Sequence, residues 1–229
     1  MNYRNVRKVF PIWLKRPVKR ALLNHQLRDA IRKIRNIGDG QVPSRPLLSQ
    51  LIVGWSNEGY AANVDYLEAV ARFSTNTEGP ILECGTGVTT ILLGLLNERR
   101  HIEVWSLEHS PEWKTRIAQV LARNEITNVR LCCSPLIDYG EFVWYEPPLG
   151  QMPKAFSLVI CDGPPGSTKG GRYGLLPVVG NRLPPGSTIL LDDSSRPGEV
   201  ELIKRWRDEG RFETQLIGCP EYQYSVICV

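Results

Sequence analysis

A glycine-rich turn lies inside the stretch GPILECGTGVTTILLG, which spans residues 79–94. Gly85 and Gly87 stand at alternate positions, after a short apolar run and before residues with helical spacing. Because glycine lets the backbone approach a ligand closely, such a turn between a strand and a helix is a common ligand site. A turn that binds a dinucleotide has glycine or alanine at the last motif position, where this chain has Thr90. The turn therefore predicts a ligand site that suits a pyrophosphate poorly.

Two acids flank this turn. Glu83 ends the apolar run before the glycines and is expected to face the ligand, and Glu108 ends the next apolar run. An acid beside the turn would repel a pyrophosphate but would suit a positive amino group, and Glu108 could bind ribose hydroxyls. S-adenosylmethionine carries a ribose, an ammonium and a sulfonium, and it has no phosphate. The acids thus favour S-adenosylmethionine over NAD, with a purely structural turn as the third interpretation.

Three more acids follow two later apolar runs, in the stretches VICDGPPG and ILLDDSSR. Asp162, Asp192 and Asp193 should meet, because the carboxyl ends of neighbouring parallel strands share one edge of a sheet. Clustered carboxylates need either a held proton or a cation between them. One hypothesis is a magnesium site formed by all three acids. The other is that Asp162 acts as a base or orienting group while Asp192 or Asp193 hydrogen-bonds the loop, and simple helix capping is the remaining alternative.

A glycine-rich loop, GSTKGGRYG, follows Asp162 and carries Lys169 and Arg172. It could fold over a substrate, and its two cations could hold a carboxylate or a phosphate. We predict that Arg172 acts at the reaction centre together with Asp162 and Asp193. Trp144 and Tyr145, in FVWYEPP, could cover a bound ligand or could simply pack in the core.

Strand patterns alternate with helix patterns from residue 80 onward, which predicts a parallel sheet covered on both faces. Strands are expected within 80–85, 102–108, 129–135, 156–162, 187–193, 212–218 and 224–229. Helices are expected at 89–99, 110–124, 172–183 and 197–209, with a further helix within 58–75. The last two strands are joined by a turn too short for a crossover, so the last one should be antiparallel. The fold class is therefore α/β, with a Rossmann-like seven-stranded sheet.

The first 36 residues form a basic extension, with eleven Lys and Arg against one acid, Asp29. Its charge is 11 − 1 = +10, so the rest of the chain carries 4 − 10 = −6. Apolar residues between Leu23 and Ile37 recur at helical spacing, and Gly38 should end this helix. The helix would either lie on an anionic surface, such as a membrane, or pack on the body. We divide the chain into an extension with linker, 1–54, and a domain, 55–229.

Composition favours a globular chain in the cytoplasm, with the basic extension as a candidate contact to a membrane surface. No run of about 18 apolar residues is present, and we expect no secretory signal. The six cysteines include no C-x-x-C pair, and we expect most of them to be buried free thiols.

The motifs carry a resemblance. ILECGTG resembles the first motif of class I S-adenosylmethionine-dependent methyltransferases, SLEHS resembles the second, and a reversed last strand is that family's hallmark. The resemblance covers about residues 55–229 and implies the Rossmann-like fold. It implies a methionine end beside the glycine turn, a ribose at Glu108 and an adenine flanked by the residues after the third strand. The implied cofactor-binding residues are Glu83, Gly85, Thr86, Gly87, Glu108, His109, Ser134, Leu136 and Asp162.

The acids after the fourth and fifth strands resemble those of catechol-type O-methyltransferases, which hold magnesium with an Asp and an Asp-Asn pair. Asp162 matches the first acid, and Asp192 and Asp193 match the pair, although the second member here is Asp. The stretches DGPPG, GGRYG and LLDDSSR also resemble a group of small bacterial methyltransferases.

We therefore expect methyl transfer to an oxygen of a small-molecule or sugar-like acceptor. Because the body is acidic and no basic stripe with stacking aromatics crosses the cleft, we expect no nucleic-acid partner. Three alternatives stay open: an N-methyltransferase, since DGPP is similar to the Asp-Pro-Pro-Tyr signature, an NAD-dependent oxidoreductase, and a non-catalytic module held at a membrane by its extension.

Overall fold

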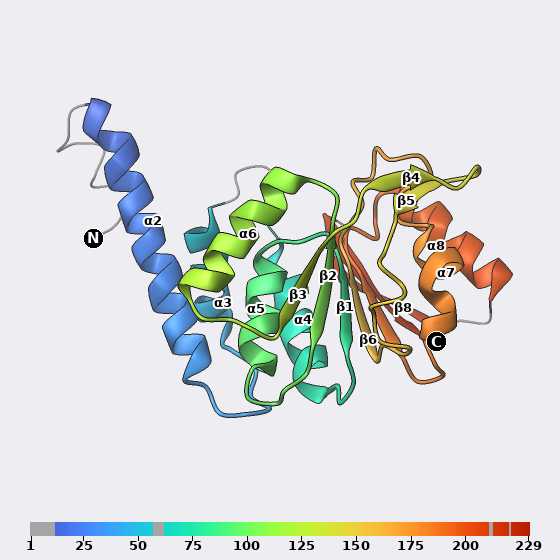
Figure 1. Ribbon diagram of the computed structural model, residues 1–229, viewed down its shortest axis with the longest axis horizontal. Coiled ribbons are helices and arrows are strands. Elements are labelled where there is room, and N and C mark those ends of the chain that lie inside the picture. Colours follow the sequence, from blue (N-terminus) through green and yellow to red (C-terminus); the bar gives the residue numbers. More distant parts are fainter. Residues whose placement is uncertain (1–11, 57–61, 211–212, 220) are drawn as a thin grey trace.

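The computed structural model describes residues 12–56, 62–210, 213–219 and 221–229, which form a layered α/β fold (Figure 1). The central sheet contains β1 (Ile81–Cys84), β2 (Val104–Glu108), β3 (Val129–Cys133), β6 (Leu158–Cys161), β7 (Thr188–Leu191), β8 (Glu213–Cys219) and β9 (Tyr222–Cys228), in the spatial order β3-β2-β1-β6-β7-β9-β8. The first five strands in this order, β3, β2, β1, β6 and β7, pair in parallel, and β9 is antiparallel to both β7 and β8. The predicted seven-stranded sheet with a reversed last strand is confirmed.

Helices cover both faces of this sheet (Figure 1). On one face lie α4 (Val64–Asn76), α5 (Val88–Asn97) and α6 (Pro111–Arg123), and on the other lie α7 (Leu175–Val179) and α8 (Pro197–Glu209). Successive strand residues pack on opposite faces of the sheet and so form two hydrophobic cores. Ile81 and Ile160 pack against the first helical layer, whereas Leu82 and Val159 pack against the second. Strands buried on both faces are typical of a parallel sheet between helical layers.

Local sequence signals set several helix boundaries. Ser110 caps α6 by accepting a hydrogen bond from the Trp113 amide at 3.2 Å, and Pro111 is the first helical residue. The helix expected at 172–183 is shorter than predicted. It comprises α7 and a single 3-10 turn at Gly180–Arg182. The chain bends before α7 because Gly170 and Gly171 adopt left-handed φ angles of 75° and 53°.

Two elements were not predicted. A hairpin of β4 (Leu136–Asp138) and β5 (Val143–Tyr145) lies beside the sheet, and its strands are too short to give a clear alternating pattern. Helix α3 (Arg45–Trp55) lies in the segment interpreted as a linker. The prolines and glycines around its start hid an apolar face that includes Leu48 and Leu51.

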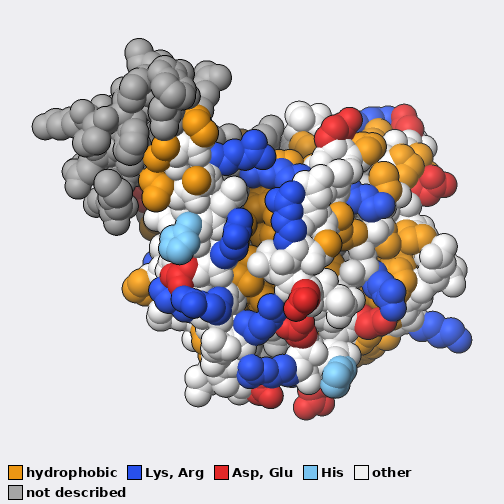
Figure 2. Space-filling view, turned by 60° about the vertical axis from the view of Figure 1, so that its left-hand side comes forward, with side chains coloured by type: hydrophobic (Ala, Val, Ile, Leu, Met, Phe, Trp, Pro, Cys, Tyr) orange, Lys and Arg blue, Asp and Glu red, His pale blue; other side chains and the backbone are white. Residues whose placement is uncertain are grey.

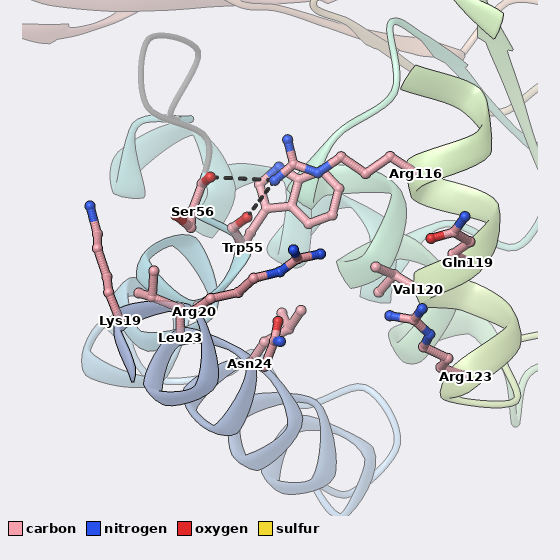
Figure 3. A pocket seen from close by; sticks show the side chains of 12 residues that line it. Lys19, Arg20, Leu23, Asn24, Trp55, Ser56, Arg116, Gln119, Val120 and Arg123 are labelled. Carbon is pink, nitrogen blue, oxygen red and sulfur yellow. Dashed lines mark hydrogen bonds between the residues drawn. The ribbon is translucent and has the colours of Figure 1, made fainter. Parts of the chain in front are cut away.

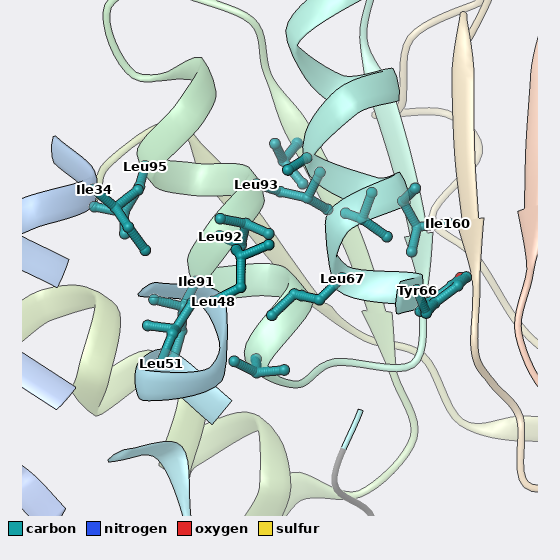
Figure 4. Close-up of a cluster of buried hydrophobic side chains, with 14 of the residues drawn as sticks. Ile34, Leu48, Leu51, Tyr66, Leu67, Ile91, Leu92, Leu93, Leu95 and Ile160 are labelled. Atoms are coloured by element: carbon teal, nitrogen blue, oxygen red, sulfur yellow. The ribbon is translucent and has the colours of Figure 1, made fainter. Parts of the chain in front are cut away.

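The predicted extension helix exists as α2 (Ile12–Arg35), and its C-terminal part packs on the body. Figure 4 shows Ile34, Leu48 and Leu51 meeting Ile91 of α5 in one cluster of buried side chains. Gly54 permits a close approach of α3 to α2, because a Cβ there would come within 2.5 Å of the Leu27 nitrogen. The N-terminal end of α2 projects beyond the body (Figure 1). The boundary at residue 54 stays a prediction, and the core continues across it.

The cysteines are less buried than expected. Cys84 and Cys161 are buried on central strands, but Cys133, Cys219 and Cys228 are exposed. Cys133 and Cys219 lie on the two edge strands, where one side of the strand has no neighbour. Within the described residues, no helix combines the length and the apolar character that crossing a membrane requires.

Candidate active site

The turn after β1 and the loop after β6 are in direct contact at the carboxyl edge of the sheet. Gly85 has a left-handed φ of 88°, and a Cβ there would lie 2.9 Å from the Gly163 nitrogen. The amides of Asp162 and Gly163 donate to the Cys84 carbonyl, at 3.0 and 2.6 Å. Glycine at position 85 is therefore required for the close approach that brings the glycine turn next to Asp162.

Glu83 does not point toward an open ligand site as the sequence interpretation expected. Its side chain is fully buried, and its two oxygens accept hydrogen bonds from the hydroxyls of Thr89 at 2.6 Å, Thr90 at 2.8 Å and Ser106 at 2.6 Å. Burial raises the pKa of Glu83 to about 7, while the three hydroxyl donors act in the opposite direction. Glu83 therefore holds the first turn of α5 in place through Thr89 and Thr90. A direct contact between Glu83 and a cofactor stays a prediction.

The backbone amides at the start of α5 are already engaged by side chains. The Thr86 amide and hydroxyl donate to Oε2 of Glu108, at 3.2 and 2.7 Å, and the Gly87 amide donates to the Thr90 hydroxyl at 2.9 Å. A pyrophosphate at a helix N-terminus binds to such amides and to the positive end of the helix. In this protein the carboxylate of Glu108 and the hydroxyl of Thr90 accept these hydrogen bonds in place of a pyrophosphate. Thr90, which stands where a dinucleotide motif has glycine, therefore also occupies one of the amides.

Glu108 lies where a ribose would be expected, at the end of β2. It is 4% exposed, and the Ser110 amide donates to its Oε1 at 2.9 Å. The His109 ring nitrogen Nδ1 lies 3.2 Å from the same oxygen. A carboxylate has about four acceptor positions, and Thr86 and Ser110 fill three of them. Glu108 thus keeps capacity to accept a hydroxyl donor.

Several buried polar atoms near Glu108 have no hydrogen-bond partner among the described residues. They include the hydroxyls of Ser134 and Tyr145. The Ser134 amide donates to the Glu108 carbonyl at 2.8 Å, which places Ser134 beside the predicted ribose position. Leu136, the other predicted adenine neighbour, begins the β4 strand and is half-buried. Unpaired buried hydroxyls are rare, so these atoms fit a polar ligand such as S-adenosylmethionine.

Tyr145 is a site residue whose role sequence reasoning left open. It is fully buried on β5, and a Cβ at Gly163 would lie 2.3 Å from its hydroxyl. Burial raises its pKa well above the ordinary value, and the nearby carboxylates of Glu108 and Asp162 act in the same direction. Its hydroxyl therefore stays protonated and lies between the two halves of the site. Only the unpredicted hairpin places it there, and its sequence neighbours gave no specific signal.

The three predicted acids do come together. Carboxylate oxygens of Asp162, Asp192 and Asp193 lie within 4.8 Å of one another. Arg172 lies among them: its Nη2 is 3.0 Å from Asp162 Oδ1 and 3.3 Å from Asp193 Oδ2. Its Nη1 donates to the Asp192 carbonyl at 2.6 Å and lies 3.9 Å from Glu199. The cation that the cluster requires is thus an arginine side chain.

This position corrects the interpretation of Arg172 as a free cation for a substrate. Its side chain is only 2% exposed, and a desolvated guanidinium is stable only beside acids that compensate its charge. Burial acts to lower the pKa of Arg172, but the charges around it, Asp162 first, raise it overall. Lys169 is 54% exposed and donates to the Gly140 carbonyl, away from this cluster.

Several acceptor positions of the cluster are also engaged by other groups. Asp192 Oδ1 accepts from the Tyr222 hydroxyl and from the Asp193 amide. Asp193 Oδ2 lies 2.8 Å from Arg196. A magnesium ion needs most of these oxygens free and needs space where Arg172 now lies. The donor set therefore does not fit magnesium, and we assign no chemical step to a metal.

Asp162 is the acid that faces the open side of the cluster. Its side chain is 40% exposed, in contrast to 18% for Asp193. Loss of hydration and the charge of Asp192 raise its pKa well above the ordinary value, and Arg172 acts in the opposite direction. It also shares a hydrogen bond with Asp192, which needs a proton on one of the two. Asp162 can therefore exchange a proton beside the glycine turn.

Comparisons with known proteins bear on the fold. No protein-family model matches the chain, and no curated protein sequence matches it. Among solved structures, it is similar to precorrin-6y C5,15-methyltransferase from Geobacter metallireducens GS-15, with a TM-score of 0.57, 13% identity, and coverage of 76% of this chain and 91% of that chain. It is also similar to a putative O-methyltransferase from Klebsiella pneumoniae, with a TM-score of 0.53, 16% identity, and coverage of 82% and 91%.

A third similar structure is an SAH-bound methyltransferase from Podospora anserina, with a TM-score of 0.51, 16% identity, and coverage of 95% of this chain and 96% of that chain. All three share the sheet and helix arrangement. The chain therefore has the Rossmann-like fold of class I S-adenosylmethionine-dependent methyltransferases. The wide coverage of the third structure extends the likeness to most of the N-terminal extension.

Proposed function

We propose that the protein transfers a methyl group from S-adenosylmethionine to an oxygen of a small-molecule acceptor. The observation that carries the cofactor assignment is the glycine turn, whose amides are engaged by Glu108 and Thr90. The buried carboxylate of Glu108 at this turn would repel a pyrophosphate, whereas it suits the hydroxyls of a ribose. The unpaired hydroxyls of Ser134 and Tyr145 support the same ligand.

The acid cluster supports the acceptor side of this proposal. S-adenosylmethionine supplies an electrophilic methyl group that an oxygen nucleophile can attack in line. The protein must then hold the acceptor in place and remove its proton. Asp162 is the exposed member of the cluster and is held by Arg172 at 3.0 Å, so it is our choice of base. Arg172 and Asp193 would orient it, and neither would touch the acceptor.

A small acceptor is favoured over a nucleic acid by charge. Outside the basic extension the chain carries a net charge of −6, from the +4 total and the +10 of residues 1–36. A strand of nucleic acid binds chiefly through phosphate contacts to basic side chains. The acids at the carboxyl edge of the sheet offer the opposite charge, so an uncharged or cationic acceptor suits this edge.

The proposal can be tested with methyl-labelled S-adenosylmethionine and a metabolite extract. We expect the wild-type protein to move the label to a small molecule, and Asp162→Asn to reduce the rate by roughly 10²- to 10⁴-fold, the usual contribution of a positioned base. The wild-type rate should rise with pH, because Asp162 with its raised pKa is inactive as a base when protonated.

Two controls keep this test specific. Asp162→Asn should bind S-adenosylhomocysteine as tightly as the wild type if Asp162 acts on the acceptor. Asp208→Asn, an exposed acid on α8, should not change the rate. Transfer by Asp162→Asn at the wild-type rate would remove Asp162 from the reaction, and label found only in nucleic acid would contradict the small-molecule acceptor.

A further inference from the structure

A cavity that contains none of the acid-cluster residues lies between α2, the C-terminal end of α3 and α6. Its volume is about 450 Å³. Four cationic side chains line it, Lys19, Arg20, Arg116 and Arg123, and none of its lining residues within the described part of the chain is acidic. Figure 3 shows Arg20 from α2 and Arg116 from α6 reaching into the same space. Like charges that converge on a cavity without an acid favour the entry of an anion.

The rest of the lining mixes apolar and polar side chains. The apolar ones are Leu23, Leu27, Trp55 and Val120, and the polar ones are Asn24, Ser56 and Gln119. Figure 3 shows Leu23 of α2 and Val120 of α6 on opposite sides of the cavity. Figure 2 shows Lys and Arg side chains around an orange hollow on this face of the molecule. A ligand for this cavity therefore combines a negative group with an apolar part.

Carbonyls and aromatic rings hold Arg116 in place. It donates to the carbonyls of Trp55 at 2.9 Å and Ser56 at 3.3 Å, and its guanidinium lies over the rings of Trp55 and Trp113 at 4.3 and 4.8 Å. Loss of hydration lowers its pKa, and no acid of the described residues forms an ion pair with it. An anion in the cavity would compensate its positive charge.

Two arginines of α2 that lie outside the cavity pair with acids. Arg32 pairs with Asp29 at 2.8 Å, and Arg35 pairs with Glu98 at 3.0 Å. Arg20 and Arg123 are exposed at the cavity, and neither forms an ion pair with any residue that the structure describes. Among the described residues, acids thus pair with arginines near the C-terminal end of α2 but with neither Arg20 nor Arg123 at the cavity.

We propose that this cavity binds the phosphate group of an anionic amphiphile. Arginine forks match the geometry of phosphate oxygens, and the leucine and tryptophan side chains would cover the adjoining apolar part. Such a group could come from a membrane phospholipid or from a free phosphate ester. The membrane source agrees with the N-terminal end of α2, which projects beyond the body and begins with the apolar and basic sequence IWLKRP.

The test uses the full chain and two probes, vesicles of phosphatidylglycerol in phosphatidylcholine and soluble glycerol phosphate. We expect binding to at least one probe, with affinity falling as salt rises. Arg20→Ala with Arg123→Ala should weaken it by about tenfold or more, since both remove charge-assisted hydrogen bonds. Binding to vesicles alone would assign the lipid source, and binding to glycerol phosphate would assign the free ester.

The matched control is Arg28→Ala with Arg207→Ala, which removes the same charge from exposed positions outside the cavity. This control should keep wild-type affinity, and both double variants should bind S-adenosylhomocysteine like the wild type, which shows that they fold. Equal weakening by both double variants would overturn the proposal in favour of diffuse charge. Absence of binding to either probe, or binding only to duplex DNA, would also overturn it.

Discussion

Two groups of acids lie at the same edge of the sheet, and different partners stabilise them. Beside β1 and β2, Glu83 and Glu108 are held by hydroxyls and backbone amides. Beside β6 and β7, Asp162, Asp192 and Asp193 surround the guanidinium of Arg172. The first group is stabilised by neutral dipoles, and the second by an opposite charge.

This difference sets what each group can do. Neutral donors do not offset the charge of an ionised carboxylate, and Glu108 keeps an acceptor position for a ligand hydroxyl. In the second group the arginine offsets part of the negative charge and keeps Asp162 positioned while it exchanges a proton. Buried charges respond strongly to the loss of one partner, whereas hydrogen bonds from neutral groups contribute about 1 kcal/mol each. Removing one partner should therefore lower the free energy of unfolding much more in the second group than in the first.

The largest effect is expected for Arg172→Ala. It leaves several acids around a vacated buried site, and breaking a buried ion pair costs about 3–5 kcal/mol. Urea unfolding at neutral pH would measure the loss in the free energy of unfolding, which should shrink at acid pH as the carboxylates become protonated. Arg45→Ala is the control, because Arg45 also contacts two acids, Asp65 and Glu68, but is 50% exposed. An equal loss in both variants would show that burial of the Arg172 cluster is unimportant.

A smaller effect, in the first group, is expected from the pH dependence of Glu83. Its pKa is raised from 4.5 to about 7 in the folded chain, so the folded state holds the proton more tightly than the unfolded state. Stability from this group is thus present below about pH 4.5 and is lost as pH rises through 7, by about 3 kcal/mol at 1.36 kcal/mol per pKa unit. Glu83→Gln, a mimic of the protonated side chain, should flatten this slope in unfolding experiments from pH 5 to 8.

The control for that slope is Glu201→Gln, an exposed acid on α8. It should leave the pH dependence unchanged. If Glu83→Gln kept the wild-type slope, the three hydroxyls would have to compensate the buried charge completely, and the contrast between neutral donors and arginine would disappear.

The smallest effect is expected from divalent metal. Since Arg172 provides the cation of the second group, adding magnesium or EDTA should not change the melting temperature of the wild-type protein. Differential scanning calorimetry would measure this. A clear magnesium-dependent stabilisation that Asp162→Asn abolishes would restore the metal hypothesis.

Local signals made much of the fold predictable. Ser110 and Pro111 fix the start of α6, and the short turn before β9 fixes its antiparallel direction. The convergence of Asp162 with Asp192 and Asp193 also followed from topology. Such features depend on neighbours in sequence or on a general rule for parallel sheets.

The destinations of particular side chains were not predictable in the same way. Arg172 was expected at the reaction centre with Asp162 and Asp193, but only tertiary packing shows that its side chain is buried and pairs with these acids. Glu83 accepts hydrogen bonds from the hydroxyls of Thr89, Thr90 and Ser106, so its side chain points away from an open ligand site. The side-chain geometry that brings these hydroxyls together is not visible in the sequence. The short hairpin that carries Tyr145 has too few residues for a periodic signal.

The most direct test of the cofactor assignment is calorimetric titration of the protein with S-adenosylhomocysteine and, separately, with NAD. We predict saturable binding of S-adenosylhomocysteine and none of NAD. Glu108→Ala should weaken that binding by about tenfold or more, since it removes charge-assisted hydrogen bonds to the ribose, whereas exposed Glu112→Ala should not. Binding of NAD in place of S-adenosylhomocysteine, or wild-type affinity in Glu108→Ala, would contradict this account of the site.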